Sequence, residues 1–352
     1  MESQSPRPRL AVVGVGLIGR RHVDLVTQSP DAELIAVVDP DRRAAAIAEK
    51  AGVAWYGTLD ELLAHDRPDG AVIATPSEQH AVHSMACIRA GVAVLVEKPI
   101  ATTVDDGLRL VEAAETGGIP LLVGHHRRHS PVLIAAREIV GRGVIGDPVA
   151  VVATTLFAKP AEYFEEAPWR RRAGGGPILI NLIHDVDALR LLVGEVVAVQ
   201  AMASNHVRRF PVEDTVAVAL RFAGGALGSM LVSDAAASPL SWELTAGEDA
   251  AFPRHDGQDC YVVAGTHGSL AIPTMRLTTY DGRPSWKLPT RTSVVPVRHG
   301  DPLGRQLEHF CAVIRHGVEP EVGGRDAVET LRVTLAVQQA ARTGEAVSVG
   351  PA

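Results

Sequence analysis

A glycine pattern near the start of the chain has the spacing of a phosphate-binding turn. The run GVGLIG over residues 14–19 reads G-x-G-x-x-G, directly after an apolar run and at the start of a helical pattern. Glycines so spaced permit a tight turn, close approach of the backbone to a pyrophosphate and close helix–strand packing. The amides at the start of the helix then face the phosphates. The residues predicted to bind a dinucleotide are Gly14, Gly16, Leu17, Ile18 and Gly19.

An acidic residue supports this interpretation and bears on the choice of cofactor. Asp39 ends the next apolar run, twenty positions beyond Gly19, where a carboxylate can hold the ribose hydroxyls. The same carboxylate would repel a 2′-phosphate, so NAD is predicted in preference to NADP. Arg42 and Arg43 lie nearby and would accept that phosphate if they turned inward, which keeps NADP as the less favoured alternative.

A lysine follows another apolar run at Ala93–Glu97, in the triplet Glu97-Lys98-Pro99. Ligands of open parallel sheets bind outside the carboxyl ends of the strands, which predicts Glu97 and Lys98 at the cofactor crevice. Partial burial and the positive nicotinamide ring would lower the pKa of Lys98, which can then hold a substrate hydroxyl and help to move its proton. The alternative is a solvent-facing lysine at a strand end. The other residues predicted to line the nicotinamide side are Thr75, Pro76 and His80.

These residues must be positioned by regular elements, and the first third of the chain alternates short apolar runs with helical patterns. This rhythm predicts βαβ units, a buried parallel sheet and a doubly wound Rossmann domain over residues 1–124. The predicted strands are Arg9–Gly14, Leu34–Asp39, Gly70–Thr75, Ala93–Glu97 and Pro120–Gly124.

After residue 125 the pattern changes to successive strands with tight turns, such as Ala223-Gly224-Gly225, which predicts a large, mainly antiparallel sheet. Residues 125–352 are therefore predicted to form an α/β domain for substrate binding and oligomerisation, and its last helix can pack back on the first domain. The predicted strands are Val149–Leu156, Val196–Ala203, Thr215–Phe222, Ala226–Ser233, Trp242–Ala246, Tyr261–Ala264, Ser269–Ile272 and Met275–Tyr280.

Composition excludes several classes of partner. The chain has 352 residues and a net charge of −7, which argues against nucleic acid or an anionic membrane as the main partner. Only 4% of residues are aromatic, so a stacking platform for single strands is not expected either. Three dispersed cysteines, Cys87, Cys260 and Cys311, and a polar start, MESQSPRPRL, indicate free thiols and a cytoplasmic protein.

A second chemical cluster follows the glycine run at residues 174–176, on a helix predicted over Ile178–Val193. Asn181, His184 and Asp187 are spaced i, i+3, i+6 and so share one face. His184 can exchange a proton near neutral pH, with Asp187 or Asp185 orienting its ring. The alternative is a structural histidine in a packed helix.

Two further polar segments are candidates for contact with substrate. His126 and Arg127 follow a predicted strand in the run HHRRH, residues 125–129, and a metal site is not expected because neighbours in an extended segment point to opposite sides. Trp169 and Arg170 precede the glycine run, where an aromatic ring can cover a sugar and an arginine can bind a carboxylate. A solvated basic loop is the alternative there.

Taken together, the glycine motif, Asp39, the Glu97-Lys98-Pro99 triplet and the GGG…HDVD stretch resemble the glucose–fructose oxidoreductase / inositol dehydrogenase / MocA (Gfo/Idh/MocA) family along essentially the whole chain. The resemblance implies hydride transfer between a nicotinamide cofactor and a secondary hydroxyl or carbonyl of a sugar, cyclitol, sugar acid or cyclic diol. It also implies homodimers or homotetramers formed through the C-terminal sheet.

The chain departs from the family pattern at Ile180, where many relatives carry an acid four residues before the histidine. The proton route is therefore assigned to Lys98 and His184, with Asn181 hydrogen-bonding the substrate. Two alternatives remain open at this point. One is an NAD-using glycosidase with transient oxidation of its substrate, and the other is a non-catalytic sensor of nucleotide and sugar.

Overall fold

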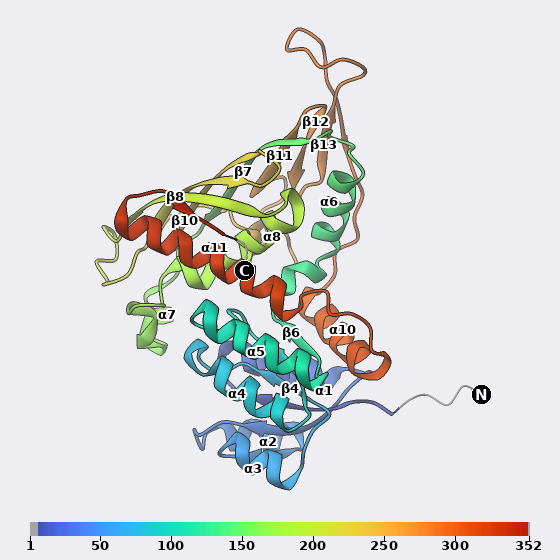
Figure 1. The fold of residues 1–352 in the computed structure, drawn as a ribbon, viewed down its shortest axis with the longest axis vertical. Helices are drawn as coiled ribbons and strands as arrows, with labels where there is room; N and C mark the ends of the chain where they lie inside the picture. Colours follow the sequence, from blue (N-terminus) through green and yellow to red (C-terminus); the bar gives the residue numbers. More distant parts are fainter. Residues whose placement is uncertain (1–5, 351–352) are drawn as a thin grey trace, which may run out of the picture. The chain divides into compact units, whose positions relative to one another are not determined.

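The computed structural model describes residues 6–350, which form two compact units (Figure 1). The first unit contains the residues up to His126 together with Leu303–Leu331, and the second contains Arg127–Pro302 together with the residues from Arg332 onward. Each unit is therefore assembled from two separate stretches of sequence. The sequence had predicted a division into residues 1–124 and 125–352, with only the last helix returning.

The first unit is built on a six-stranded parallel sheet of order β3-β2-β1-β4-β5-β6, the doubly wound order predicted from the alternation of strands and helices. Its strands are β1 (Arg9–Val13), β2 (Glu33–Val38), β3 (Ala54–Tyr56), β4 (Gly70–Ile73), β5 (Ala93–Val96) and β6 (Leu121–Val123). Its helices are α1 (Leu17–Gln28), α2 (Ala44–Ala51), α3 (Leu59–His65), α4 (Ser77–Arg89), α5 (Val104–Gly117), α10 (Pro302–His316) and the first part of α11 (Gly324–Thr343).

The core of the first unit depends on a segment from late in the sequence. Strands β4 and β5 are buried along their whole length, as expected for a parallel sheet covered on both faces. Helix α10 contributes Leu307, Phe310 and Cys311 to the same apolar cluster as Leu10 of β1. Gly70 makes room for it, because a Cβ at that position would lie 2.9 Å from the Phe310 ring. Helix α10 thus completes the apolar core on one face of the parallel sheet.

The second unit contains a nine-stranded sheet of order β14-β13-β12-β11-β7-β10-β9-β8-β15. Strands β7 and β10 pair in parallel, whereas the other neighbouring strands pair antiparallel. The strands are β7 (Pro148–Leu156), β8 (Val196–Ser204), β9 (Thr215–Phe222), β10 (Leu227–Ser233), β11 (Tyr261–Gly265), β12 (Gly268–Ile272), β13 (Arg276–Thr279), β14 (Arg291–Val294) and β15 (Val347–Ser348). The helical segments are η1 (His126–His129), α6 (Pro131–Gly141), α7 (Ala161–Glu166), η2 (Pro168–Arg171), the π-helical η3 (Ile178–Leu182), α8 (Ile183–Val193) and α9 (Trp242–Thr245).

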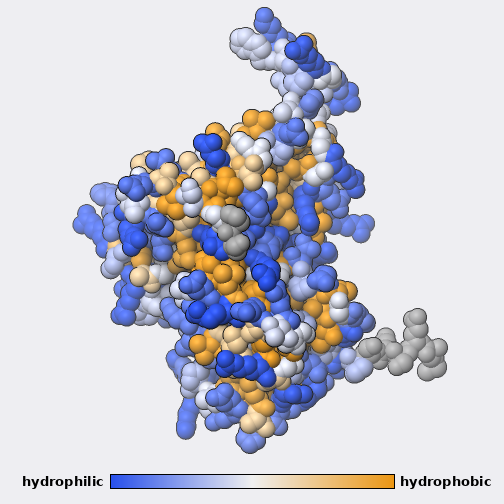
Figure 2. Space-filling view, in the orientation of Figure 1, coloured by the Kyte–Doolittle hydropathy of each residue, from blue (hydrophilic) through white to orange (hydrophobic). Residues whose placement is uncertain are grey.

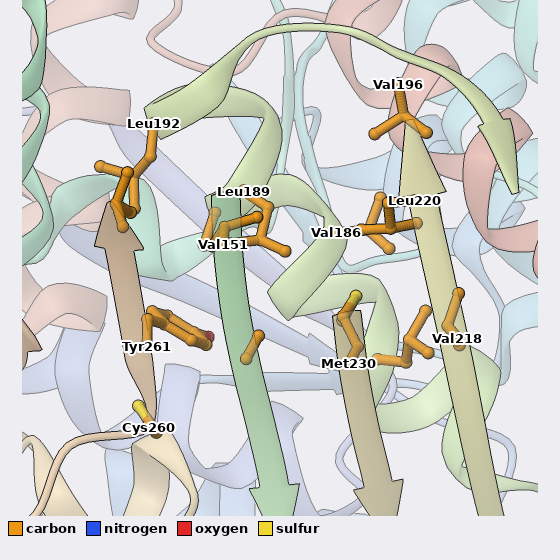
Figure 3. Packing of buried hydrophobic residues seen from close by; sticks show 14 of the residues in the cluster. Val151, Val186, Leu189, Leu192, Val196, Val218, Leu220, Met230, Cys260 and Tyr261 are labelled. Atoms are coloured by element: carbon orange, nitrogen blue, oxygen red, sulfur yellow. The ribbon is translucent and has the colours of Figure 1, made fainter. Parts of the chain in front are cut away.

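One face of this sheet packs on α8 and forms the core of the second unit (Figure 3). Val151, Leu220 and Met230 from three strands meet Val186 and Leu189 of the helix. Successive strand residues point to opposite faces, so the alternate residues form a second, exposed face. The large apolar side chains exposed on the strands of this sheet include Val149, Val152, Met202, Leu227, Leu231 and Val262.

The predicted strand at Trp242–Ala246 is wrong, because this segment forms the helical turn α9. The Ser241 side chain accepts a hydrogen bond from the backbone N–H of Leu244, which is the pattern of a helix N-cap. The Trp242 ring stacks on Tyr261 with centroids 5.6 Å apart, and its Nε1 donates to Glu248 Oε2 at 2.9 Å. Capping and burial of one tryptophan therefore decide the local structure, which the apolar pattern alone did not show.

Some elements carry no hydrophobic signal and were not predicted. Strand β14 is exposed at all four positions, so it lacks the alternation by which strands are recognised. The segment between β13 and β14 projects from the sheet (Figure 1), and its visible surface is largely polar (Figure 2). No helix within residues 6–350 has the length and apolar character needed to cross a membrane.

Candidate active site

The glycine turn between β1 and α1 shows why each glycine is required. A Cβ on Gly14, which has φ +87°, would lie 2.8 Å from the backbone of Ala74 and Thr75 at the end of β4. A Cβ on Gly19 would lie 1.9 Å from the Gly14 carbonyl oxygen. Gly16 has nothing within 4 Å of such an atom, so its side is open. Two glycines therefore permit backbone packing, and the third leaves space for a ligand.

The start of α1 has the properties of an anion site. Gly16 is the N-cap residue and supplies no side-chain hydrogen bond to the first turn, so the leading amides are not capped by a side chain. Leu17, the first helical residue, is 76% exposed. A pyrophosphate fits this arrangement, because its oxygens accept from amides at a helix N-terminus and gain from the helix dipole.

Asp39 follows β2 and holds the glycine turn while remaining partly exposed. Its Oδ2 accepts from the Val15 backbone N–H at 2.9 Å, and its Oδ1 accepts from the Asp41 N–H at 2.9 Å. Arg43 is paired with Asp41, and this hydrogen bond holds the pKa of the Asp41 carboxyl at about 2. The carboxylate of Asp39, which is predicted to hold the ribose, is thus hydrogen-bonded directly to the glycine turn. Of the two nearby arginines, Arg43 is paired with Asp41.

His80 joins the loops that follow β4 and β5. Its Nδ1 lies 2.7 Å from the Pro99 carbonyl oxygen, and its Nε2 lies 2.8 Å from the Thr75 carbonyl oxygen. The residue is 2% exposed, and burial lowers its pKa. His80 was predicted to line the nicotinamide side, and its ring nitrogens face the backbone carbonyls of Thr75 and Pro99.

Glu97 is also buried, and its carboxylate accepts a hydrogen bond from the backbone of Lys98. Its Oε1 lies 2.8 Å from Nε2 of His22 on α1, and its Oε2 accepts from the Lys98 backbone N–H at 3.3 Å. Burial opposes its ionisation, but the hydrogen bond from His22 and the charges of His22, Lys98 and His126 outweigh burial and lower the pKa of Glu97 to about 2. Glu97, which was predicted at the cofactor crevice, is only 6% exposed and is a buried anion.

Lys98 itself is partly exposed and joins Pro99 through a cis peptide bond. Gly124, at the end of neighbouring β6, has no room for a side chain, because a Cβ there would lie 3.0 Å from the Glu97 carboxylate. His22 was missed by sequence reasoning: it lies on the helix after the glycine motif, 75 residues from Glu97, and nothing in its local pattern indicates a partner.

The two arginines of η1 are structural. Arg127 is 1% exposed, and its guanidinium donates to Asp185 Oδ1 at 2.6 Å and to Glu243 Oε1 at 2.7 Å. Arg128 donates through Nε and Nη2 to both carboxylate oxygens of Asp187, each at 2.8 Å. Arg127 and Asp187, both predicted to contact substrate, are thus buried and held in ion pairs within the second unit. The segment is a 3-10 turn and not the extended strand assumed in the metal argument.

Two other predicted residues remain accessible. His126 is partly exposed, and Trp169 is 43% exposed. Arg170 is less so, because its guanidinium lies 3.7 Å from the centroid of the Tyr163 ring and its Nη1 donates to the Tyr163 carbonyl at 2.6 Å. No cluster of three or more His, Cys, Asp or Glu side chains within residues 6–350 is arranged to hold a metal ion.

The predicted helix bearing His184 is interrupted in its first part. Residues Ile178–Leu182 form a π-helical turn, and the α-helix starts at Ile183. Such turns inside helices occur frequently at functional sites. Asn181 lies on the π turn and His184 on the first turn of α8, and they are 8% and 7% exposed. Since Asp185 and Asp187 are engaged with Arg127 and Arg128, their role is to anchor the helix.

A lysine that the sequence did not single out lies beside Asn181. Lys159 follows β7, and its Nζ donates to Asn181 Oδ1 at 2.7 Å. The lysine side chain is 8% exposed, and its Nζ lies 3.6 Å from Asp234 Oδ2. Charge in a predicted loop is normally solvated, so only the parallel pairing of β7 with β10 reveals that Lys159 and Asp234 follow adjacent strand ends.

Comparison with known families matches both halves of the chain. Residues 8–125 match the description "Oxidoreductase family, NAD-binding Rossmann fold", and residues 133–271 match "GFO/IDH/MocA C-terminal domain". The 1,5-anhydro-D-fructose reductase of Ensifer adhaerens is 28% identical over 346 residues, covering 97% of this chain and 98% of the reductase. The scyllo-inositol 2-dehydrogenase (NAD(+)) of Bacillus subtilis is 27% identical, covering 96% and 94%.

Solved structures agree with this assignment. The WlbA dehydrogenase from Bordetella pertussis, in complex with NADH and UDP-GlcNAcA, has a TM-score of 0.79 and 25% identity, covering 99% of this chain and all of that chain. The names of the relatives are those of dehydrogenases and reductases, which favours net hydride transfer over the glycosidase and sensor alternatives. The chain belongs to the GFO/IDH/MocA oxidoreductase family and is an NAD-dependent oxidoreductase.

Proposed function

We propose that the enzyme transfers a hydride between nicotinamide and a secondary hydroxyl or carbonyl carbon of a sugar, cyclitol, sugar acid or cyclic diol, with Lys98 and His184 handling the proton. The names of the relatives support the sugars and cyclitols in this range, as does the D-apiose dehydrogenase of Paraburkholderia graminis, which is 27% identical over 355 residues. The UDP-GlcNAcA in the WlbA complex supports the sugar acids. The observation that carries the proposal is the support of Lys98 by the buried Glu97 anion at the end of β5.

Lys98 is suited to hold the reacting hydroxyl. Its backbone is held by Glu97, and Glu97 is in turn held by His22, so the lysine stem starts from a rigid point at the carboxyl end of the parallel sheet. Ligands of such sheets bind at that end. An ammonium that is only partly exposed donates a strong hydrogen bond to an alcohol oxygen and stabilises the alkoxide character that develops as the hydride leaves.

His184 is suited to take the alcohol proton. The neutral imidazole is a base near neutral pH, and the acids that flank His184 are neutralised by Arg127 and Arg128. Those pairs fix the helix on which the histidine lies. Asn181, three residues earlier, would hydrogen-bond the substrate, and Trp169 would cover it.

The path of the chain supports a shared role for the two residues. His126 belongs to the first unit, where its charge helps to lower the pKa of Glu97, the neighbour of Lys98. The next two residues, Arg127 and Arg128, belong to the second unit and are paired with the acids of α8. One four-residue turn therefore connects the anchor of Lys98 with the anchors of the His184 helix.

The bound nicotinamide would supply the hydride acceptor, while the protein binds and orients it. Gly14, Gly16 and Gly19 with the start of α1 would hold the pyrophosphate, and Asp39 would hold the ribose. We propose NAD over NADP because Asp39 would repel a 2′-phosphate and Arg43 is occupied by Asp41.

The test is a spectrophotometric screen of polyols, sugars, sugar acids and cyclic diols with NAD⁺ and with NADP⁺, read at the NADH absorbance band. NADH is expected with at least one alcohol. His184→Ala should lower kcat by about 10²-fold for that alcohol, whereas Lys287→Gln on the projecting segment should not. Release of a free sugar without NADH, or full activity of the His184 variant, would contradict the proposal.

We also propose that the enzyme is a cytoplasmic homo-oligomer joined through the nine-stranded sheet. The exposed apolar face that includes Val152, Met202 and Leu231 supports a second copy as its partner, since apolar strand surface of this kind is usually covered. All three cysteines are free and buried, which supports a reducing compartment. Analytical ultracentrifugation of the wild type and Val152→Glu tests the oligomer: a monomeric wild type would contradict it.

A further inference from the structure

The amide of Asn181 has a fixed orientation that bears on the substrate. An ammonium group has only donors, so the atom of Asn181 that faces Lys159 Nζ at 2.7 Å must be the oxygen Oδ1. The Nδ2 group is then directed elsewhere. Within residues 6–350 Nδ2 has no hydrogen-bond partner, although Asn181 is only 8% exposed, and it retains contact with solvent. Asn181 thus offers a hydrogen-bond donor, whereas a carboxylate at this place would offer only acceptors.

Lys159 is itself held firmly. Its carboxylate partner Asp234 follows β10, and the bridge between Ala158 and Ala235 joins the two segments just beyond the strand ends. Its Nζ also lies 4.8 Å from the centroid of the Tyr163 ring. A lysine whose side chain is only 8% exposed cannot turn away from the amide without leaving these contacts. The Asn181 orientation is therefore set by the fold and not by the ligand.

Lys159, the partner of this amide, belongs to a cluster that contains two arginines. Arg208 shares Asp234 with Lys159, with 2.7 Å between its Nε and Asp234 Oδ1. Arg170 stacks on the other contact of Lys159, Tyr163, and has no carboxylate partner within the described residues. Lys159 and Arg208 thus share the Asp234 carboxylate, and Arg170 adds a third cation to the cluster.

Two more acids lie close by but are committed to structural bonds. Asp214 accepts from the backbone N–H groups of Val207 and Arg208, and Glu213 accepts from the Ile178 N–H at the start of the π turn at 3.1 Å. Burial also raises the pKa of Glu213. Neither acid removes the donor character of the Asn181 amide.

We propose that Lys159 determines substrate specificity through Asn181, and that the preferred substrate presents a carboxylate to the Asn181 Nδ2 group, as a hydroxy acid of the sugar-acid type does. This inference rests on the proposed function and narrows its substrate class. Lys159 is a positioning residue: it orients the amide and adds positive potential, while Asn181 makes the contact. A carboxylate accepts the unpaired donor and gains from the surrounding cations.

The experiment compares matched ligands on the NAD⁺-loaded enzyme: D-gluconate with D-glucitol, and D-galacturonate with D-galactose. Calorimetry measures Kd and NADH absorbance measures kcat/KM. For at least one pair the wild type should prefer the carboxylate by about tenfold or more, equivalent to roughly 1.4 kcal/mol. Asn181→Asp, nearly equal in size, should abolish or reverse that preference, because it replaces the donor with acceptors, and should change the neutral partner less.

Variants at Lys159 separate orientation from folding. Lys159→Arg keeps only donors and should retain the carboxylate preference, whereas Lys159→Gln can donate or accept, so the amide can flip and the preference should fall. Lys287→Gln removes an exposed lysine charge and should behave as the wild type. NADH binding, followed by tryptophan fluorescence, should be the same in all variants and reports that they are folded.

The outcomes distinguish this inference from the function on which it rests. A wild type that prefers the neutral ligand in both pairs, or an Asn181→Asp variant that keeps the carboxylate preference, overturns the inference while dehydrogenase activity stands. An enzyme that oxidises no alcohol in the wider screen overturns the proposed function, and the calorimetric comparison of gluconate with glucitol then still decides whether the amide selects a carboxylate.

Discussion

Lys98 and Lys159 both follow the carboxyl end of a parallel strand, yet they are supported in opposite ways. Lys98 follows β5 and is adjacent in sequence to Glu97, whose carboxylate accepts from the Lys98 backbone N–H and is hydrogen-bonded to His22. Lys159 follows β7, and its anchor Asp234 follows β10, 75 residues later. The first lysine is held at its backbone N–H and is partly exposed, whereas the second is held by its ammonium. This difference supports the proposals that Lys98 handles the proton and that Lys159 orients another side chain.

The largest effect is expected from removing the amine of Lys98. Lys98→Ala should reduce kcat by about 10³-fold, within the range for loss of a general acid or base. NADH should still bind, because the glycine turn is unchanged, and steady-state kinetics with fluorescence titration measures both. If turnover persisted at the wild-type rate, Lys98 would have no chemical role and the two lysines would be alike.

The second change removes one of the two ion pairs that hold the helix bearing His184. Arg128→Met would leave the Asp187 carboxylate buried without its bidentate partner, which should lower the free energy of unfolding by about 3–5 kcal/mol. Urea denaturation measures this loss. Arg325→Met, which breaks the exposed pair with Glu115, is the matched control and should cost less than about 1 kcal/mol. Equal effects of the two changes would remove the structural role given to Arg128.

The third prediction concerns pH and the anchor of Lys98. The folded-state pKa of Glu97, about 2, lies below its unfolded value near 4.5. The carboxylate therefore contributes stability above pH ~4.5 that is lost as the pH falls towards 2, up to about 3 kcal/mol. Urea midpoints of the wild type should fall across this window. Glu97→Gln should be less stable at pH 7 and should lose less between pH 4.5 and 2.5, and parallel curves would contradict the assignment.

The smallest expected effect concerns the relative affinity of the first unit for NAD⁺ and NADP⁺. Asp39→Ala removes a ribose contact and a brace of the glycine turn, so Kd for NAD⁺ should rise about tenfold, near 1.4 kcal/mol. Affinity for NADP⁺ should fall less or should rise, because the repulsion of its 2′-phosphate is gone. Calorimetric titration with both nucleotides checks this. An unchanged ratio of the two affinities would show that Asp39 acts only on the turn.

The predictability of the two units differs for a physical reason. In the first unit the alternation of apolar runs and helices defines a parallel sheet, so the glycine turn, Asp39 and Lys98 could be located from local patterns. The roles of Glu97 and His80 could not, because burial and partners 75 and 19 residues away decide them. Sequence alone shows that a polar group follows a strand, but not whether it faces a ligand or a carbonyl.

In the second unit the decisive contacts are longer in range. The parallel pairing of β7 with β10 lies inside a largely antiparallel sheet and has no local signal, so Lys159 was read as part of a charged loop. Asp187 was assigned to substrate because polar residues on an apolar helix need a partner, and Arg127 because it follows the carboxyl end of a strand. The partner is another part of the same unit.

The return of α10 to the first unit limits where the polypeptide can be truncated. A polypeptide that stopped at His126 would contain every nucleotide-binding motif but would lack Leu307, Phe310 and Cys311. Its sheet would expose apolar surface on the side that α10 covers, so such a fragment should aggregate and not behave as a portable cofactor module. Recombination between relatives would have to exchange the 303–331 stretch along with the amino-terminal one.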